Sequence, residues 1–379
     1  MTAPPAGITE DVDVRRPHVE PEVPDGIAIM LSWGVFYLLP KVKLLKIILL
    51  PAAVIVLSVL TILTWRQCGY WKSGIELFSH ALRSTNNNDD SHCNLGVALA
   101  AEGKNEEAIF HYLEAIKINP NNDEAHCNIG VALAAQGKNK EAIIHYLEAI
   151  RLNPDNDNAH YNLGVALAAQ GKNEEATAHY LAAIKLNPDN DNAYYNRGVD
   201  LAAQGKNKEA IVQYRTAIEI NPNNDKAHSN LGFALVSEGK NEEAIAHYLA
   251  AIKINPNGVL TYFNLAIAFE KQGKFEEAIA RYREVLSINP DYFGAHINLG
   301  NILKMQSKND EAIDHYRQAL QSDPNNPGIY FNIGAALLNK GEIKKAAEHF
   351  RQAVYLKPDF KEAREALKLV IDMEKKTKG

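Results

Sequence analysis

The chain is poor in cysteine and has no excess of positive charge. Its 379 residues include three cysteines, and Cys93 and Cys127 occupy equivalent places in neighbouring copies of a repeat described below. Stacked repeats place such sites roughly 10 Å apart, whereas a disulfide needs Cα atoms closer than about 7 Å. With 40 Lys and Arg against 46 Asp and Glu, the net charge is −6. We therefore expect free thiols and no nucleic-acid partner, because binding a nucleic acid requires clustered positive charge.

Motifs that carry chemistry are also missing. No glycine-rich phosphate loop follows a strand, and neither a nucleophile elbow nor a paired-carboxylate site is present. Ten of the thirteen histidines recur at two positions of the repeat, and no pair has the tight spacing of zinc ligands with a third ligand nearby. The sequence therefore predicts no enzyme, no catalytic residues, no metal site and no cofactor.

The N-terminal segment 1–25 has only valine and isoleucine as sizeable apolar side chains and is rich in proline and acidic residues. Such a segment cannot bury enough surface to offset its ordering entropy, so we predict disorder over 1–25. Residues 26–40 then form a short apolar stretch. It is too short to span a membrane comfortably, and an interfacial segment, a re-entrant segment and a thin first span all remain open.

One long uncharged run is present. Ile47 to Trp65 spans 19 residues without a charge, which as a helix measures about 28 Å, close to the thickness of the hydrocarbon core. Aromatic residues cluster at its end, as they do at membrane interfaces. We predict a transmembrane helix over 44–66, with residues 47–65 in the lipid bilayer, in preference to a buried helix of a soluble protein.

The charge before this run predicts an orientation. Lysines at 41, 43 and 46 lie between the two apolar stretches, and positive loops prefer the cytoplasm. Whether the chain crosses once or twice, everything after Trp65 would then lie outside the cytoplasm, in a periplasm or a lumen.

The chain repeats itself from position 89 to position 360, eight times and without insertion, with a period of about 34 residues. Each copy predicts two helices from the spacing of its apolar and small residues. In the second copy, Gly137 is expected to end the first helix, Asn139 to cap the second, and Pro154 to stop it. The copies start at Asp89, Asp123, Asp157, Asp191, Asp225, Val259, Phe293 and Pro327.

This pattern resembles the tetratricopeptide repeat, over about 272 of the 379 residues. A Leu-Gly or Ile-Gly pair recurs, departing only as Arg197-Gly198 and Leu265-Ala266. The position that holds Trp in the family holds His92, His126, His160, Tyr194, His228, Tyr262, His296 and Tyr330. The resemblance implies an all-α, right-handed superhelix of eight helix pairs that mediates protein–protein interaction.

Both ends of the array are expected to be capped. Counting back one repeat length from the first copy places Phe78 on the aromatic position and Ala81 on the second alanine position, so we read 67–88 as a degenerate half repeat. The predicted membrane helix would stand where its first helix should be. Residues 361–379 are amphipathic and are expected to form a C-terminal capping helix, which keeps the last apolar face from water.

The junction LTWRQCGYWKSGIELFSHAL carries a second resemblance. It is similar to the point where multi-spanning O-mannosyltransferases of the transmembrane-and-tetratricopeptide type pass into their repeats. The resemblance implies repeats facing a lumen or periplasm. It also implies an alternative function, as the C-terminal portion or acceptor-recognition subunit of a membrane glycosyltransferase, but no part of this chain matches the family's catalytic domain.

An asparagine follows each His or Tyr position by two residues in all eight copies. In the repeat fold this position faces the concave surface, where stacking would align the amides so that they bind the N–H and C=O groups of an extended peptide. The repeats of O-GlcNAc transferase use an asparagine ladder at this place, and the resemblance suggests that role here. The residues are Asn94, Asn128, Asn162, Asn196, Asn230, Asn264, Asn298 and Asn332.

Two alternatives remain at this stage. The asparagines could serve only the fold, and the pattern does not decide between the two roles. Arg197 and Asp200, three residues apart on one predicted helix, are expected to pair with each other, with a recognition role as the alternative. The function we predict is a membrane-anchored scaffold whose partners are other proteins or extended peptide segments.

Overall fold

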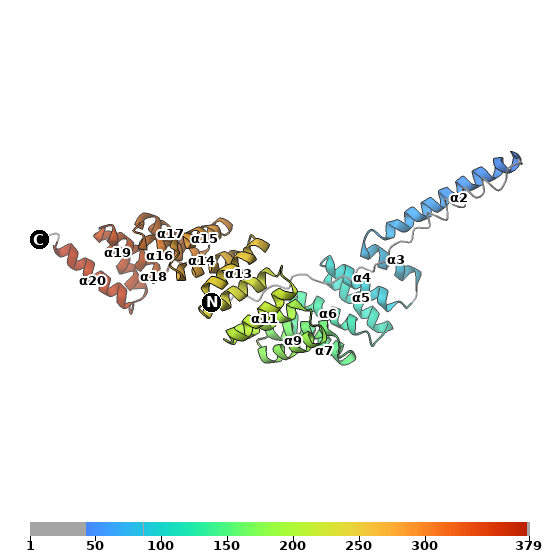
Figure 1. The fold of residues 1–379 in the computed structure, drawn as a ribbon, viewed down its shortest axis with the longest axis horizontal. Coiled ribbons are helices and arrows are strands. Elements are labelled where there is room, and N and C mark those ends of the chain that lie inside the picture. The colour runs from blue at the N-terminus through green and yellow to red at the C-terminus, as the bar shows by residue number, and fades with distance from the viewer. Residues whose placement is uncertain (1–42, 86, 377–379) are drawn as a thin grey trace. The chain divides into compact units, whose positions relative to one another are not determined.

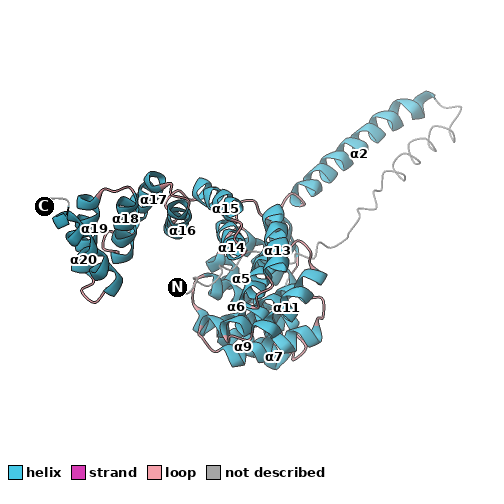
Figure 2. Ribbon diagram, turned by 60° about the vertical axis from the view of Figure 1, so that its left-hand side comes forward, coloured by secondary structure: helices cyan, strands magenta, loops and turns pink. Residues whose placement is uncertain are grey.

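The computed structural model describes residues 43–85 and 87–376, and in this part the chain forms 19 helices and no strand (Figures 1 and 2). Within helices, the side chains of 43–50, 66–70 and 376 are not described. Contacts divide the chain into two compact units, Met1–Asn187 and Pro188–Gly379, which are treated separately below. The predictions for 1–25 and 26–40 lie outside the described residues.

The first unit contains two N-terminal helices and three helix pairs. Its helices are α2 (Lys43–Tyr70), α3 (Gly74–Ser84), α4 (Asp89–Ala101) paired with α5 (Asn105–Ile118), α6 (Asp123–Ala135) with α7 (Asn139–Leu152), and α8 (Asp157–Ala169) with α9 (Asn173–Leu186). Each pair packs against the next, as α5 does against α6.

The second unit contains five helix pairs and a final helix. They are α10 (Asp191–Ala203) with α11 (Asn207–Ile220), α12 (Asp225–Ser237) with α13 (Asn241–Ile254), α14 (Val259–Lys271) with α15 (Phe275–Ile288), α16 (Phe293–Met305) with α17 (Asn309–Ser322), α18 (Pro327–Asn339) with α19 (Ile343–Leu356), and α20 (Lys361–Lys376). The prediction of an all-α repeat array is confirmed.

The turn within each pair depends on a residue that can adopt a left-handed backbone. Gly137 has φ 75° between α6 and α7, as predicted from its place in the repeat. The prediction for Asn139 was wrong. Lys138 is the residue that precedes α7, and no side chain caps this helix. Asn139 is already its first helical residue, so its side chain is not placed to accept from the N–H groups of the first turn.

Capping asparagines stand before the first helices instead. Asn122 Oδ1 accepts from Ala125 N at 2.8 Å at the start of α6. Asn122 Nδ2 donates to Asp89 Oδ2 at 3.3 Å, and Asn119 Nδ2 donates to the same oxygen at 2.9 Å. These bonds tie the end of one repeat to its beginning, and they lower the pKa of Asp89.

The core of each pair is an aromatic ring placed between alanines. Ala142, Tyr146 and Ala149 of α7 are buried. The ring of Tyr146 lies so close to Gly130 of α6 that a Cβ there would stand 2.4 Å from it. The Leu-Gly pair of the repeat therefore has a packing reason, because glycine gives the aromatic ring its space.

First helices lie closer to one another than second helices do. In the first unit, α4 contacts α6 and α6 contacts α8. In the second unit, α10 contacts α12 and α12 contacts α14. Successive second helices of the described chain do not make contacts of that extent. Within each unit the first helices therefore line the inner, concave side.

Helix α3 packs against α4, and its Phe78 is half-buried in the same apolar cluster as Leu95. None of its residues is fully buried. Truncating Phe78 to alanine should therefore cost about 2 kcal/mol, less than a fully buried aromatic. Hydrogen exchange should accelerate in α4 and not in α8, because repeats are stabilised mainly by their neighbours. Unchanged exchange in α4 would mean that α3 is only a linker.

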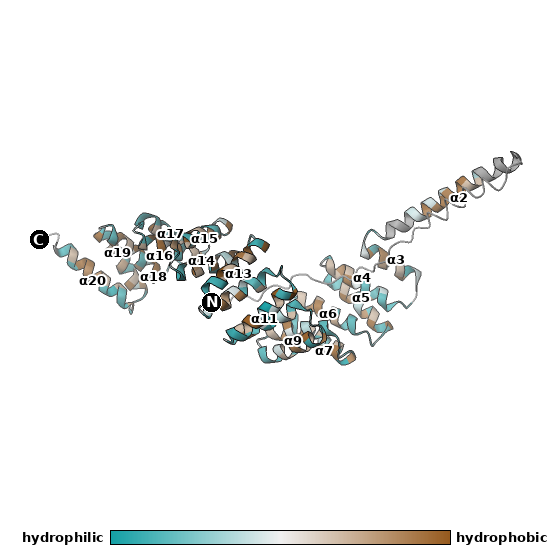
Figure 3. Cartoon of the chain, viewed as in Figure 1, coloured by the Kyte–Doolittle hydropathy of each residue, from teal (hydrophilic) through white to brown (hydrophobic). Residues whose placement is uncertain are grey.

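Helix α2 precedes α3, and apolar residues run along its described portion (Figure 3). In the part of the chain that the structure describes, no helix combines the length and the apolar character needed to cross a membrane. The transmembrane helix predicted over 44–66 is therefore not supported by the structure.

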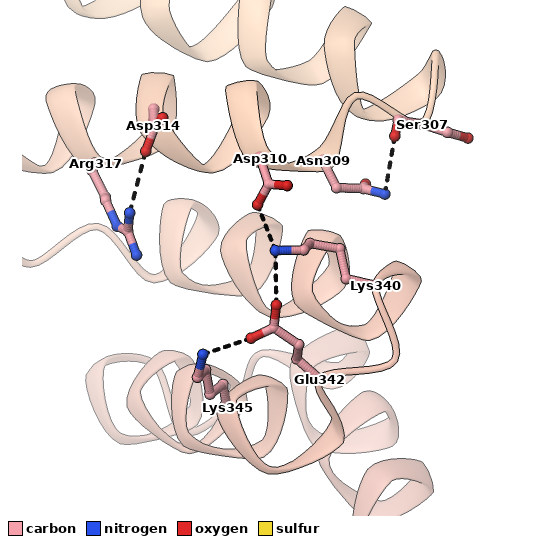
Figure 4. Close-up of polar contacts among 8 residues, drawn as sticks. All are labelled: Ser307, Asn309, Asp310, Asp314, Arg317, Lys340, Glu342 and Lys345. Carbon is pink, nitrogen blue, oxygen red and sulfur yellow. Dashed lines mark hydrogen bonds and ion pairs between the residues drawn. The ribbon is translucent and has the colours of Figure 1, made fainter.

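Polar contacts join the last two repeats (Figure 4). Lys340 Nζ lies 2.5 Å from Asp310 Oδ1 of α17 and 2.7 Å from Glu342 Oε1, and Lys345 Nζ lies 2.7 Å from Glu342 Oε2. The hydrogen bonds from Lys340 and Lys345 lower the pKa of Glu342 to about 2.

Helix α20 packs on α19 and buries Val370, as a capping helix would.

Candidate binding face

The predicted asparagines lie on consecutive first helices, on the side where these helices approach each other. In the first unit they are Asn94 on α4, Asn128 on α6 and Asn162 on α8. Three residues further along each helix a valine is only half-buried. The inner side of this unit therefore presents a row of amides next to a row of apolar side chains, which we call the binding face.

The binding face of the second unit carries the other five asparagines, on α10, α12, α14, α16 and α18. Beside them, Val199 is 36% exposed and Phe233 is 55% exposed. Phe233 lies one turn after Asn230 on α12, so an amide and an exposed aromatic ring stand together there. Exposed aromatic side chains are typical of protein-binding surfaces.

In the first unit, sulfur atoms hold the amides in place. Asn128 Nδ2 donates to Cys93 Sγ at 3.7 Å, and Asn162 Nδ2 donates to Cys127 Sγ at 3.9 Å. Both thiols are free and buried, and burial raises the pKa of Cys93 to about 11 and that of Cys127 to about 12. They remain protonated at neutral pH and contact the amides as neutral thiols.

Phenol groups take the same role in the second unit. Asn230 Nδ2 donates to Tyr195 OH at 3.1 Å, and Asn298 Nδ2 donates to Tyr282 OH at 3.0 Å. At the last position Asn332 accepts from Lys304 Nζ at 3.0 Å. The ladder is thus built into the stacking of the repeats, and each amide that uses one N–H keeps a second N–H for another partner.

The binding face changes in character along the second unit. The place held by Ala202 in α10 is held by Glu270 in α14 and by Lys304 in α16. Glu270 accepts from Tyr282 OH at 2.9 Å. Burial lowers the pKa of Lys304, whose ammonium lies 6.0 Å from the Tyr316 ring centre. At this position, an uncharged residue in α10 is therefore replaced by one charged residue in α14 and one in α16.

The expected pairing of Arg197 with Asp200 was wrong. Arg197 Nη1 donates to Gln213 Oε1 of α11 at 3.0 Å, because its position on α10 points toward the second helix of its own repeat. Asp200 is 6% exposed, and its Oδ2 has no hydrogen-bond partner in the described part of the chain. Burial raises the pKa of Asp200 to about 6.

The sequence shows that the histidines recur at two positions of the repeat, but it did not predict that these positions meet. Ten of them meet in five pairs, each formed by a first-helix histidine and the second-helix histidine 19 residues later. The constant spacing was the available signal. Across the described residues, no group of three or more metal-binding side chains comes together.

Paired helices stacked through an inner row of first helices define an α-helical repeat protein of the solenoid class. Models of the TPR repeat and the tetratricopeptide repeat match residues 98–341 and 327–360. The chain belongs to the tetratricopeptide repeat family.

Several solved structures are similar to this chain. One described as a functional characterization of Pseudomonas aeruginosa pilF is 19% identical, covers 55% of this chain and 94% of its own, and has a TM-score of 0.51. YrrB, described as a TPR protein with an unusual peptide-binding site, is 22% identical over 48% of this chain and 95% of its own, with a TM-score of 0.44. MamA is 26% identical over 43% and 95%, with a TM-score of 0.39. No curated protein matches the chain.

Proposed function

We propose that this chain is a non-catalytic scaffold that binds an extended polypeptide on the binding face of its first helices. The observation that carries the proposal is the way the amides are held. Four of the asparagines donate one N–H to a thiol or phenol of the array, which fixes the side chain and leaves a second N–H and an acceptor oxygen for a ligand.

A peptide backbone matches this pair of groups. An extended chain offers one N–H and one C=O per residue, and an amide can bind both. Because the amides are already oriented, little side-chain entropy is lost when the ligand binds. The half-buried valines and Phe233 add apolar contact without selecting a particular sequence. The expected ligand is therefore unfolded or extended polypeptide with weak sequence preference.

Replacing these four asparagines (Asn128, Asn162, Asn230 and Asn298) with alanine should weaken binding of a reduced, carboxymethylated, permanently unfolded protein by about 30-fold or more, since four lost hydrogen bonds amount to about 2 kcal/mol at least. Each lost hydrogen bond exchanged with water contributes on the order of 0.5–1 kcal/mol. The measurement is fluorescence anisotropy with the labelled unfolded protein. The fold should persist, because alanine is a better helix former than asparagine.

A matched control replaces exposed asparagines outside the binding face with alanine. Asn121 and Asn223, in loops that follow second helices, are such residues. This variant should bind as the parent does. Equal weakening in both variants, or an unchanged affinity of the ladder variant with its helix content intact, would place recognition elsewhere. Unfolding of the ladder variant would assign the asparagines to the fold alone.

The location of the repeats outside the cytoplasm stays a prediction from the uncharged run at 47–65 and the lysines before it. Protease added to spheroplasts should digest the array while a cytoplasmic marker stays intact. Digestion that begins only after lysis would show that the predicted orientation is wrong.

The alternative role in a membrane glycosyltransferase rests on the resemblance at the junction, and it predicts that a multi-spanning transferase co-purifies with the chain.

A further inference from the structure

Five repeats contain a histidine pair that joins their two helices. In each pair the two Nδ1 atoms face each other and the ring planes are tilted by 31–40°. The Nδ1 atoms are 3.1 Å apart in His92–His111, 3.3 Å in His126–His145, 3.1 Å in His160–His179, 3.0 Å in His228–His247 and 3.0 Å in His296–His315. At this distance one nitrogen must donate and the other must accept.

The second nitrogen of the first-helix histidine shows which one donates. In three pairs it lies near a backbone carbonyl, with His160 Nε2 at 3.1 Å from Pro154 O, and the equivalent distances of His228 and His296 at 3.3 and 2.8 Å. A carbonyl oxygen only accepts, so this Nε2 carries the hydrogen. The Nδ1 of a neutral first-helix ring is then the acceptor, and the second-helix Nδ1 donates.

These tautomers set the order of protonation. The second-helix histidine has its lone pair on Nε2, so a first proton can be added there while its Nδ1 still donates to the partner ring. A second proton has to enter the Nδ1 of the first-helix histidine. That places two N–H groups head to head about 3 Å apart on two like-charged rings, which removes the hydrogen bond between the helices.

Charges on the same and neighbouring helices face these rings. Burial is the largest cause that lowers the pKa of every second-helix histidine, and the charge of the partner ring adds to it. Nearby carboxylates raise and nearby arginines lower the pKa of the second-helix histidines and of His126 and His228 on the first helices. These groups are Glu107, Glu114, Glu148, Arg151, Glu175, Arg215, Asp225, Glu243, Arg283, Glu311 and Asp314.

We propose that the five histidine pairs make the packing of helix against helix depend on proton concentration, so that acid loosens the paired repeats and spares the others. The fourth repeat has Tyr194 and Gln213 at the two positions, and the sixth has Tyr262 and Arg281. Acid loosening is therefore local: repeats three and five loosen, and repeat four, which lies between them in the chain, does not.

The direction follows from the preference of the folded chain for neutral rings. A histidine whose folded pKa lies below its unfolded value of about 6.5 stabilises the fold above that value. This contribution is lost as the pH falls through the folded pKa. The loss is expected below pH 6.5, and it is larger in repeats that carry a pair.

The test is hydrogen exchange of the full chain at pH 7.5 and 5.0, corrected for the intrinsic rate and in the presence of a chelator. We expect exchange in α9 and α13 to accelerate by about fivefold in acid, the factor that corresponds to losing one hydrogen bond between the helices. Exchange in α11 should not accelerate, and protonation of Asp200 on α10, whose pKa burial raises to about 6, should slow it. A variant carrying His160→Tyr and His179→Gln, which copies the fourth repeat, should lose the effect in α9 and keep it in α13.

Two results would overturn the proposal. One is an equal acid response in α9, α11 and α13, or a response that persists in α9 of the double variant. The other comes from ¹⁵N NMR of labelled histidine at pH 7.5. It should show the proton on Nδ1 of His179 and on Nε2 of His160, and the opposite tautomers would remove the basis of the ordered protonation.

Discussion

Replacing Tyr248 with alanine should lower the free energy of unfolding of the repeats around it by about 4 kcal/mol, as truncation of a buried aromatic does. Its side chain is fully buried, and its ring fills the space above Gly232, where a Cβ would stand 2.7 Å from the ring. The neighbours cannot fill the space that the ring leaves, because Gly232 has no side chain and Ala244 and Ala251 on the same helix as Tyr248 carry only a methyl group. Urea unfolding fitted to a nearest-neighbour scheme measures the effect.

The hydroxyl of the same tyrosine should contribute nothing. Tyr248 OH is buried without a hydrogen-bond partner in the described chain, so Tyr248→Phe should leave stability unchanged or raise it by up to about 1 kcal/mol. Tyr316 is the matched control, since its OH donates to Asn301 Oδ1 at 2.7 Å. Tyr316→Phe should cost about 1 kcal/mol. If both substitutions change the free energy of unfolding by the same amount, the hydrogen bond of Tyr316 OH does not contribute to stability.

The helices could be predicted from the sequence because their signals are local. A glycine that permits a left-handed turn, and alanines spaced to pack around one aromatic, act within a single copy and recur in the next. The failed prediction for Asn139 is also local. Asparagine is a good cap by type, but the turn begins one residue earlier, and that shift depends on backbone geometry that the residue type does not encode.

The candidate site was less predictable, because its contacts cross between helices. That Asn128 would donate to Cys93 depends on the stacking distance of two repeats, and that Arg197 would choose Gln213 over Asp200 depends on the direction of one side chain. The histidine pairs could have been found from their constant spacing, since both positions face the same helix interface. Which of the two rings donates the hydrogen bond could not be predicted from the sequence, because it depends on a proline carbonyl near the other nitrogen of the first-helix ring.

Asp200 is the position where a single substitution should stabilise the protein. Seven repeats carry alanine or isoleucine at the equivalent place, and Asp200 sets a buried carboxyl there with one oxygen unpartnered. Burial raises its pKa from the ordinary value of 3.8 to about 6. The fold therefore favours the protonated acid, whose stability is present below pH 3.8 and is lost as the pH rises through 6.

Asp200→Ala should thus raise the free energy of unfolding by about 2–3 kcal/mol at pH 7.5, since each pKa unit corresponds to about 1.4 kcal/mol. The gain should shrink to about 0.5 kcal/mol near pH 4, where the parent carboxyl is protonated in the folded state and about half ionised in the unfolded state. Urea unfolding of parent and variant at both pH values measures it. The histidine pairs titrate alike in the two proteins, so their effect cancels in the difference. A gain that is equal at pH 4 and pH 7.5 would mean that packing or helix propensity, and not the buried charge, is what Asp200 costs.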